Sequence, residues 1–219
     1  KSNITQWFTK LLNLFSPQIT KQKSSIMSLS LLEAVQTELG YPALQKIDPN
    51  TQVVKEDDTT PDEHRFSQAS IPAVLTALYN YSRTDEGATH ILNADPATQW
   101  SDLIFTNNKT AIVQHIAGYA NYTTENVAEK LDTIASCAVG IIWKEELPED
   151  ASMQDVKRYM SSQLPHILPY LPATLQMGEL LHNNTLDDRT NKMEGPLSNI
   201  MRAIGGGFSN EETATSKEK

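Results

Sequence analysis

Apolar side chains along this chain recur mainly at intervals of three and four residues, the spacing that places them on one face of an α-helix. The clearest run is Val127, Leu131, Ile134, Ala138 and Ile142, and similar runs cover residues 26–39, 63–82 and 153–168. Strand signals are nearly absent, because the chain lacks both a sustained apolar–polar alternation and an Asn-Gly or Asp-Gly turn. The pattern predicts an all-α fold, a multi-helix bundle of about eight to ten helices.

Several residues indicate where these helices begin and end. Thr123 or Thr124 is expected to cap the long helix that Pro148 ends, and Asp85 to cap a short helix over residues 85–92. Pro72 lies inside residues 63–82, so that helix is expected to restart or kink there. Further helices are expected at residues 100–104, 111–117, 173–182 and 196–204.

A short pattern occurs twice and indicates an internal repeat. Val35-Gln36 is followed by Gly40, and Val113-Gln114 is followed by Gly118, with the same spacing and with Tyr after each glycine. Each glycine is expected to close an amphipathic helix as a left-handed residue. One interpretation is a duplicated helix–Gly turn–helix unit, and the other is two ordinary helices that both end in glycine. A second echo pairs Ser67-Gln68 with Ser162-Gln163, each shortly before a proline.

The first 25 residues are predicted to form an amphipathic helix and a linker. The helical spacing places five large apolar side chains on one stripe, and these are the candidate partner-binding residues: Trp7, Phe8, Leu11, Leu12 and Phe15. Residues 1–32 carry four lysines and no acidic residue, whereas the whole chain has a net charge of −9. The remainder therefore carries −13, and attraction between the two parts is expected.

The rest of the chain is divided by its composition. Residues 26–205 are expected to form a single helical domain with a mobile acidic loop near residues 49–63. Residues 206–219, at the end of a Gly-Gly-Gly run, are expected to be a disordered tail. We recognise no targeting sequence and expect a cytoplasmic location. Because the chain does not begin with Met, the sequence leaves open whether a signal segment precedes Lys1.

Five short elements follow one another along the chain: residues 31–39 before Gly40, residues 71–78, Asp85-Glu86-Gly87-Ala88, residues 113–118, and residues 127–142. In the order of these motifs the chain resembles the YidB-like family of uncharacterised bacterial helical proteins. The resemblance covers about residues 28–145. It implies an all-α bacterial fold and brings no known activity or catalytic residue.

Candidate chemistry in the sequence is sparse. No two of the five histidines lie three or four residues apart, so a helical zinc face is absent, and His115 is expected to be a hydrogen-bonded packing residue. Cys137 is expected to be a small buried side chain. Residues 183–194 resemble a calcium loop in their oxygen-bearing side chains, but Asp188 stands where the turn requires glycine. We assign no catalytic residue, cofactor or metal.

These observations favour a non-enzymatic helical interaction or scaffold module. The N-terminal helix is expected to dock on a protein partner, a second copy of the chain or the body of the same chain, with a membrane surface as the alternative. A nucleic-acid partner is not expected, because the chain is acidic and has no basic cluster, and no small-molecule substrate is identified. A hydrolase or metal-dependent enzyme, with a site built from scattered residues, is the further alternative.

Overall fold

The computed structural model describes residues 30–48, 59–148, 150–183 and 186. Within them the chain is helical and contains no strand, which confirms the all-α class. The α-helices are α2 (Leu31–Glu38), α3 (Asp62–Ser82), α4 (Asp85–Leu92), α5 (Trp100–Phe105), α6 (Lys109–Ala120), α7 (Thr124–Ile141), α8 (Met153–Ile167) and α9 (Met177–Leu180). The shorter turns are η1 (Thr106–Asn108), the π-helical η2 (Ile142–Glu146), η3 (Leu168–Tyr170) and η4 (Ala173–Leu175). The expected number of helices stays a prediction, because the remaining residues are not described.

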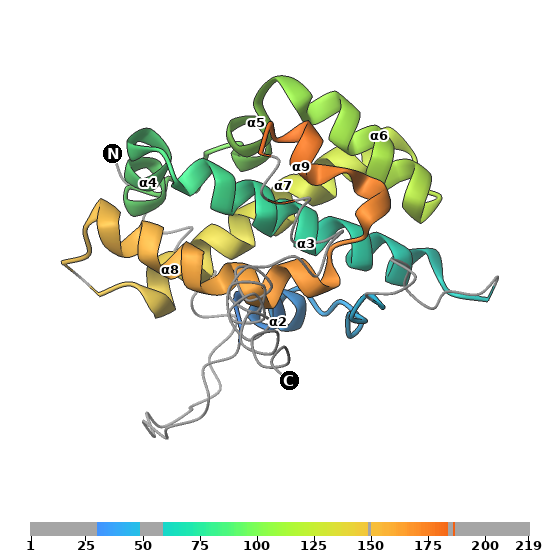
Figure 1. The fold of residues 1–219 in the computed structure, drawn as a ribbon, viewed down its shortest axis with the longest axis horizontal. Coiled ribbons are helices and arrows are strands. Elements are labelled where there is room, and N and C mark those ends of the chain that lie inside the picture. Colours follow the sequence, from blue (N-terminus) through green and yellow to red (C-terminus); the bar gives the residue numbers. More distant parts are fainter. Residues whose placement is uncertain (1–29, 49–58, 149, 184–185, 187–219) are drawn as a thin grey trace, which may run out of the picture.

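The helix α3 is central, and the others pack around it. Figure 1 shows α3 crossing the middle of the molecule, with α2 and α8 along one side and α5, α6 and α9 along the other. Its residues 66–78 are all buried, although the sequence predicted a single apolar face. Small side chains such as Ser70, Ala73 and Thr76 lie between the large ones, so neighbouring helices can approach from every direction. Pro72 lies inside α3 without ending it, so the helix does not restart at this residue, and a kink there, the other alternative, stays a prediction.

The helix α2 begins later than the apolar pattern predicted. Ser30 is extended and forms a capping box with Glu33, so a helix over residues 26–39 cannot run through this position. The backbone N–H of Leu31, one of the groups that a helix start leaves unpaired, donates to Gln163 Oε1 on α8 at 2.9 Å. At the other end Gly40 has φ +68°, the left-handed conformation expected of it.

The repeated glycine pattern has different structures in its two copies. Gly118 does not close its helix, because α6 continues to Ala120 and Asn121 takes the left-handed conformation instead. Continuation of the helix keeps Ala117 and Ala120 buried against the core. The prediction that Gly118 ends a helix was wrong, and the pattern does not define a common helix–Gly turn–helix unit.

The Ser-Gln echo has the same local structure in both copies. Ser67 donates to the carbonyl of His64, three residues earlier, and Ser162 donates in the same way to Tyr159. The side chain of each glutamine forms hydrogen bonds with backbone groups of another segment. Gln68 Nε2 donates to the carbonyls of Gln45 and Tyr170, and its Oε1 accepts from Gln45 N–H.

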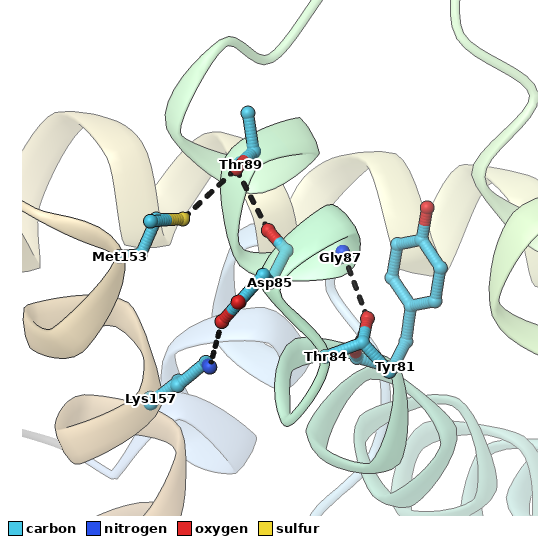
Figure 2. A network of polar contacts seen from close by, with 7 residues as sticks. All are labelled: Tyr81, Thr84, Asp85, Gly87, Thr89, Met153 and Lys157. Atoms are coloured by element: carbon cyan, nitrogen blue, oxygen red, sulfur yellow. Dashed lines mark hydrogen bonds and ion pairs between the residues drawn. The ribbon is translucent and has the colours of Figure 1, made fainter.

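A close approach joins the end of α3 to the start of α4, as Figure 2 shows. The N-cap of α4 is Thr84, one residue before the predicted Asp85, and its hydroxyl oxygen accepts from Gly87 N–H at 2.9 Å. A Cβ atom added at Gly87 would lie 2.1 Å from the carbonyl oxygen of Tyr81, so only glycine fits. Asp85 instead pairs with Lys157 on α8 at 2.5 Å. These contacts, with the hydroxyl of Thr89 3.1 Å from Met153 Sδ, fix α4 to α3 and α8.

The remaining expectations are met in part. Thr123 caps α7 as predicted, with its hydroxyl oxygen near Asn126 N–H. The helix expected over 173–182 is broken, because Gln176 takes a left-handed conformation between η4 and α9. Six large apolar residues at helical spacing in α3, α6 and α7 are fully buried: Leu75, Leu78, Ile112, Ile116, Leu131 and Ile134.

Several predictions fall wholly or partly on residues that are not described. These are the helix over residues 196–204, the tail 206–219, both boundaries of the domain 26–205, and residues 49–58 of the acidic loop. The end of that loop was wrongly placed, because Asp62 and Glu63 form the first turn of α3, where acidic side chains favour a helix start.

Candidate docking groove

The five candidate partner-binding residues, Trp7, Phe8, Leu11, Leu12 and Phe15, lie outside the described residues. The structure therefore does not place them. A candidate binding surface does occur on the described part of the molecule, at the C-terminal half of α7.

Two neighbouring hollows flank this part of α7. The larger has a volume of about 520 Å³ and is lined by residues of α7, η2, the segment before α5 and the start of α5: Ala94, Asp95, Pro96, Trp100, Ser136, Val139, Gly140, Trp143 and Lys144. The smaller, about 310 Å³, lies toward the end of α2 and is lined by Glu38, Leu39, Thr133, Ser136, Cys137, Gly140, Ile141 and Lys144. Because both include Ser136, Gly140 and Lys144, they form one surface across α7, which we call the α7 groove.

The floor of the α7 groove consists of small side chains at helical spacing. Thr133, Ser136, Cys137 and Gly140 follow the i, i+3, i+4, i+7 pattern that places residues on one helix face. Gly140 has no neighbouring heavy atom within 4 Å of the place where its Cβ would lie, so the groove is open above it. Such a floor allows the backbone of a second helix to approach closely.

Trp143 forms part of the wall of the larger hollow and is unusually exposed. With 54% of its surface accessible, it exceeds the other exposed large apolar side chain of the described residues, Met153, at 37%. It lies in η2, where the Leu147 N–H bonds the carbonyl of Ile142, five residues earlier, at 3.1 Å. Turns of this π-helical type occur frequently at functional sites. An exposed tryptophan beside an apolar hollow is typical of a protein-binding surface.

Charge around the α7 groove is mixed and slightly negative. Glu38 lies at the α2 side, Asp95 at the opposite side, and Lys144 between the two hollows. Cys137 lies on the floor and is only half-buried, so the expectation of a buried cysteine was wrong. Burial, with a smaller effect from Glu38, raises the pKa of its thiol to about 11, so the side chain is a poor nucleophile at neutral pH.

One arrangement in the structure resembles a catalytic pair, and its surroundings exclude that role. Lys109 Nζ lies 2.9 Å from Ser101 Oγ, the relation found in Ser–Lys hydrolases. However, Ser101 has no exposed surface, so a substrate carbonyl cannot reach its hydroxyl. The ammonium group of Lys109 is also ion-paired with Asp102 at 2.5 Å, whereas a general base needs a free amine. Together these contacts join the start of α5 to α6.

The histidines of the described residues have structural contacts or lie apart from one another. His115 Nδ1 lies 3.2 Å from the carbonyl oxygen of Leu175, which confirms its expected role as a hydrogen-bonded packing residue. His90 Nδ1 lies 2.5 Å from the hydroxyl of Tyr81, and neither residue lines the α7 groove. No group of three or more metal-ligating side chains occurs in the part of the chain that the structure describes. The calcium-loop resemblance over residues 183–194 falls mainly outside that part.

Sequence reasoning missed the α7 groove, although its signal was present. The buried positions of α7 include Leu131, Ile134 and Ala138, and small residues lie between them in the second half of the helix: Thr133, Ser136, Cys137 and Gly140. Trp143 lies seven residues after Ser136 and four after the buried Val139, so the sequence places a large aromatic side chain at the edge of a stripe of small residues.

Comparisons with protein-family models, curated proteins and solved structures give no match for this chain. The fold class therefore rests on the structure alone, and the resemblance to the YidB-like family stays a prediction. Among the helices that the structure describes, none is long and apolar enough to cross a membrane.

Proposed function

We propose that this chain is a non-enzymatic helical interaction module, which binds a helix of a protein partner in the α7 groove. Its N-terminal amphipathic segment, with Trp7, Phe8, Leu11, Leu12 and Phe15, docks on a partner, a second copy or the body of the chain itself. The observation that carries the proposal is the exposed Trp143 beside an apolar hollow of about 520 Å³.

The shape and chemistry of the α7 groove support a helical ligand. A helix that docks in a groove inserts apolar side chains at i, i+3, i+4 and i+7. It needs a groove floor of small side chains, because large ones would prevent its backbone from approaching. The open space above Gly140 provides that floor, and Trp143, Pro96 and Val139 provide apolar walls. The charged groups Glu38, Asp95 and Lys144 lie around this apolar surface and can fix the direction of the ligand.

Gly140→Leu tests the proposal, because it fills the groove from within. The added side chain enters open space, and leucine is a better helix former than glycine, so the fold should be kept. Gly118→Leu is the matched control, since Gly118 is also inside a helix and also has open space at its Cβ position, but on α6. The full chain and both variants are used as bait in extract of the source organism, and the dissociation constant is then measured for the purified partner. We expect Gly140→Leu to weaken binding at least tenfold and Gly118→Leu to leave it unchanged, whereas equal binding by all three refutes the proposed function.

A further inference from the structure

The position of the α7 groove relative to the start of α2 identifies a specific occupant. We infer that the N-terminal segment of the same chain, residues 3–16, docks in the α7 groove and covers it in the free protein. This inference rests on the proposed function and names the ligand that the groove holds before a partner arrives.

The chain that precedes α2 starts close to the groove. The last residue of α2, Glu38, and the following Leu39 line the smaller hollow, and Ser30 caps the other end of this eight-residue helix. At 1.5 Å per residue, Ser30 is about 12 Å from the groove along the helix axis. A linker over residues 16–29 spans about 46 Å when extended and about 20 Å on average as a flexible coil. The linker therefore reaches either hollow without strain.

The composition of the segment matches the surface. Its stripe of Trp7, Phe8, Leu11, Leu12 and Phe15 has the i, i+4, i+8 spacing of a helix that docks by one face. The small floor residues accept such a helix at close range, and Trp143 and Pro96 provide contacts for its aromatic side chains. A free helix of about 13 residues is marginal in water, so docking supplies the burial that it needs.

Net charge favours the N-terminal segment over the C-terminal segment as the occupant of the groove. Residues 1–29 carry four lysines and no acid, a charge of +4. Residues 187–219 carry six acidic and five basic side chains, a charge of −1. The body and the charged groups of the groove, Glu38, Asp95 and Lys144, are net negative, so electrostatics favour the N-terminal segment.

Tethering makes even weak docking sufficient. A short flexible linker holds its segment at an effective concentration of about 1 mM. If the segment alone binds with a dissociation constant of about 0.1 mM, it occupies the groove about 90% of the time when tethered. A partner helix must then displace it, so the segment acts as a built-in competitor.

Hydrogen exchange of the full-length chain tests this inference directly. We expect the amides of residues 3–16 to exchange about tenfold more slowly than in a synthetic peptide of the same residues, equally in the unmodified chain and in Gly118→Leu. Gly140→Leu should return their exchange to the peptide rate. The inference is overturned by unprotected amides in the unmodified chain, or by protection that Gly140→Leu leaves intact. Protection that grows with protein concentration overturns it as well, because that result identifies a second copy as the source of the segment.

A second measurement uses Cys137, which lies on the floor of the groove. In the variant Phe8→Ala, Leu11→Ala the segment should be released, and alkylation of Cys137 at pH 9 should become at least threefold faster than in the unmodified chain. An unchanged rate means that residues 3–16 do not cover the groove. If the segment proves unprotected but Gly140→Leu still weakens partner binding, the inference fails and the proposed function stands. If anionic vesicles, and not the groove, protect residues 3–16, a membrane surface is the ligand of the segment and the inference fails.

Discussion

Gln68 provides the sharpest test of how the segments of this molecule are held together. Its side chain is 4% exposed and makes three hydrogen bonds, with Gln45 N–H (2.8 Å), Gln45 C=O (3.0 Å) and Tyr170 C=O (2.8 Å). These bonds join α3 to the segment after α2 and to η3, more than 100 residues away along the chain. Gln68→Met keeps the length of the side chain and removes all three bonds.

The expected cost follows from the number of bonds and from what replaces them. Each hydrogen bond contributes about 0.5–1.5 kcal/mol net, which gives about 1.5–4.5 kcal/mol for the three. Gln45 is exposed, so water can satisfy its backbone groups in the variant, whereas Tyr170 is partly buried. We therefore expect the free energy of unfolding to fall by about 2–3 kcal/mol, measured by urea unfolding as a lower midpoint at an unchanged slope. Peptides over residues 41–48 should also exchange hydrogen faster, because Gln45 N–H loses its partner.

Gln163→Met is the matched control, because Gln163 is the corresponding glutamine of the Ser-Gln echo. It accepts one bond, from Leu31 N–H, so its loss should cost about 1 kcal/mol and should leave exchange over residues 41–48 unchanged. If Gln68→Met costs no more than Gln163→Met, the three bonds do not stabilise the fold and the reasoning from their geometry is wrong.

Three further predictions follow from local contacts. Gly87→Ala should lower the free energy of unfolding by about 2 kcal/mol or more in urea titrations, because its Cβ would lie 2.1 Å from a backbone oxygen. Lys157→Met should raise the pKa of Asp85, measured by NMR titration, because the Lys157 ammonium group hydrogen-bonds this carboxylate and holds its pKa below the usual range. The stabilisation from this pair should be present at neutral pH and should be lost as the pH falls through the lowered pKa of Asp85, since the unfolded chain then binds the proton more tightly. The alkylation rate of Cys137 should rise about tenfold per pH unit to at least pH 10, because its pKa is about 11.

Each of these outcomes has its own control. Gly118→Ala should stabilise the protein or leave it unchanged, since a Cβ there meets open space, and a similar cost at both glycines would contradict the steric argument. A pKa of Asp85 that does not change in Lys157→Met would mean that the ion pair does not form in solution. Alkylation that stops increasing near pH 8.5, as for a thiol of the urea-unfolded chain, would mean that Cys137 is solvated.

The fold class and the core were predictable because both depend on side-chain periodicity. The spacing of Leu131 and Ile134 placed both residues in the core, and both are fully buried. The burial of α3 on all sides was not predictable in this way, because small polar residues such as Ser70 and Thr76 normally indicate the solvent-exposed face of a helix. They are buried only because helices from both ends of the sequence cover them, and no local pattern carries that information.

The two glycines of the apparent repeat show a second limit. Gly40 ends its helix and Gly118 does not, although their local sequences match. A helix can end at any residue that tolerates the left-handed conformation, and Asn121 offers that option three residues after Gly118. Burial of Ala120 favours the longer helix, so tertiary packing decided the outcome. The α7 groove was missed for a related reason, since a groove depends on how far apart its neighbouring elements lie.

The central position of α3 has a consequence for the synthesis of this protein. One of its main neighbours, α8, ends at Ile167, so the ribosome must add 85 residues after Ser82 before that cover exists. At about 5–20 residues per second, this takes about 4–17 s, during which Phe66, Ile71 and Leu75 have no complete apolar surroundings. The nascent chain should therefore be an aggregation-prone chaperone substrate over this interval, and ribosome-bound chains that end near residue 120, when α3 has left the exit tunnel, should be captured far more than the chain released from the ribosome.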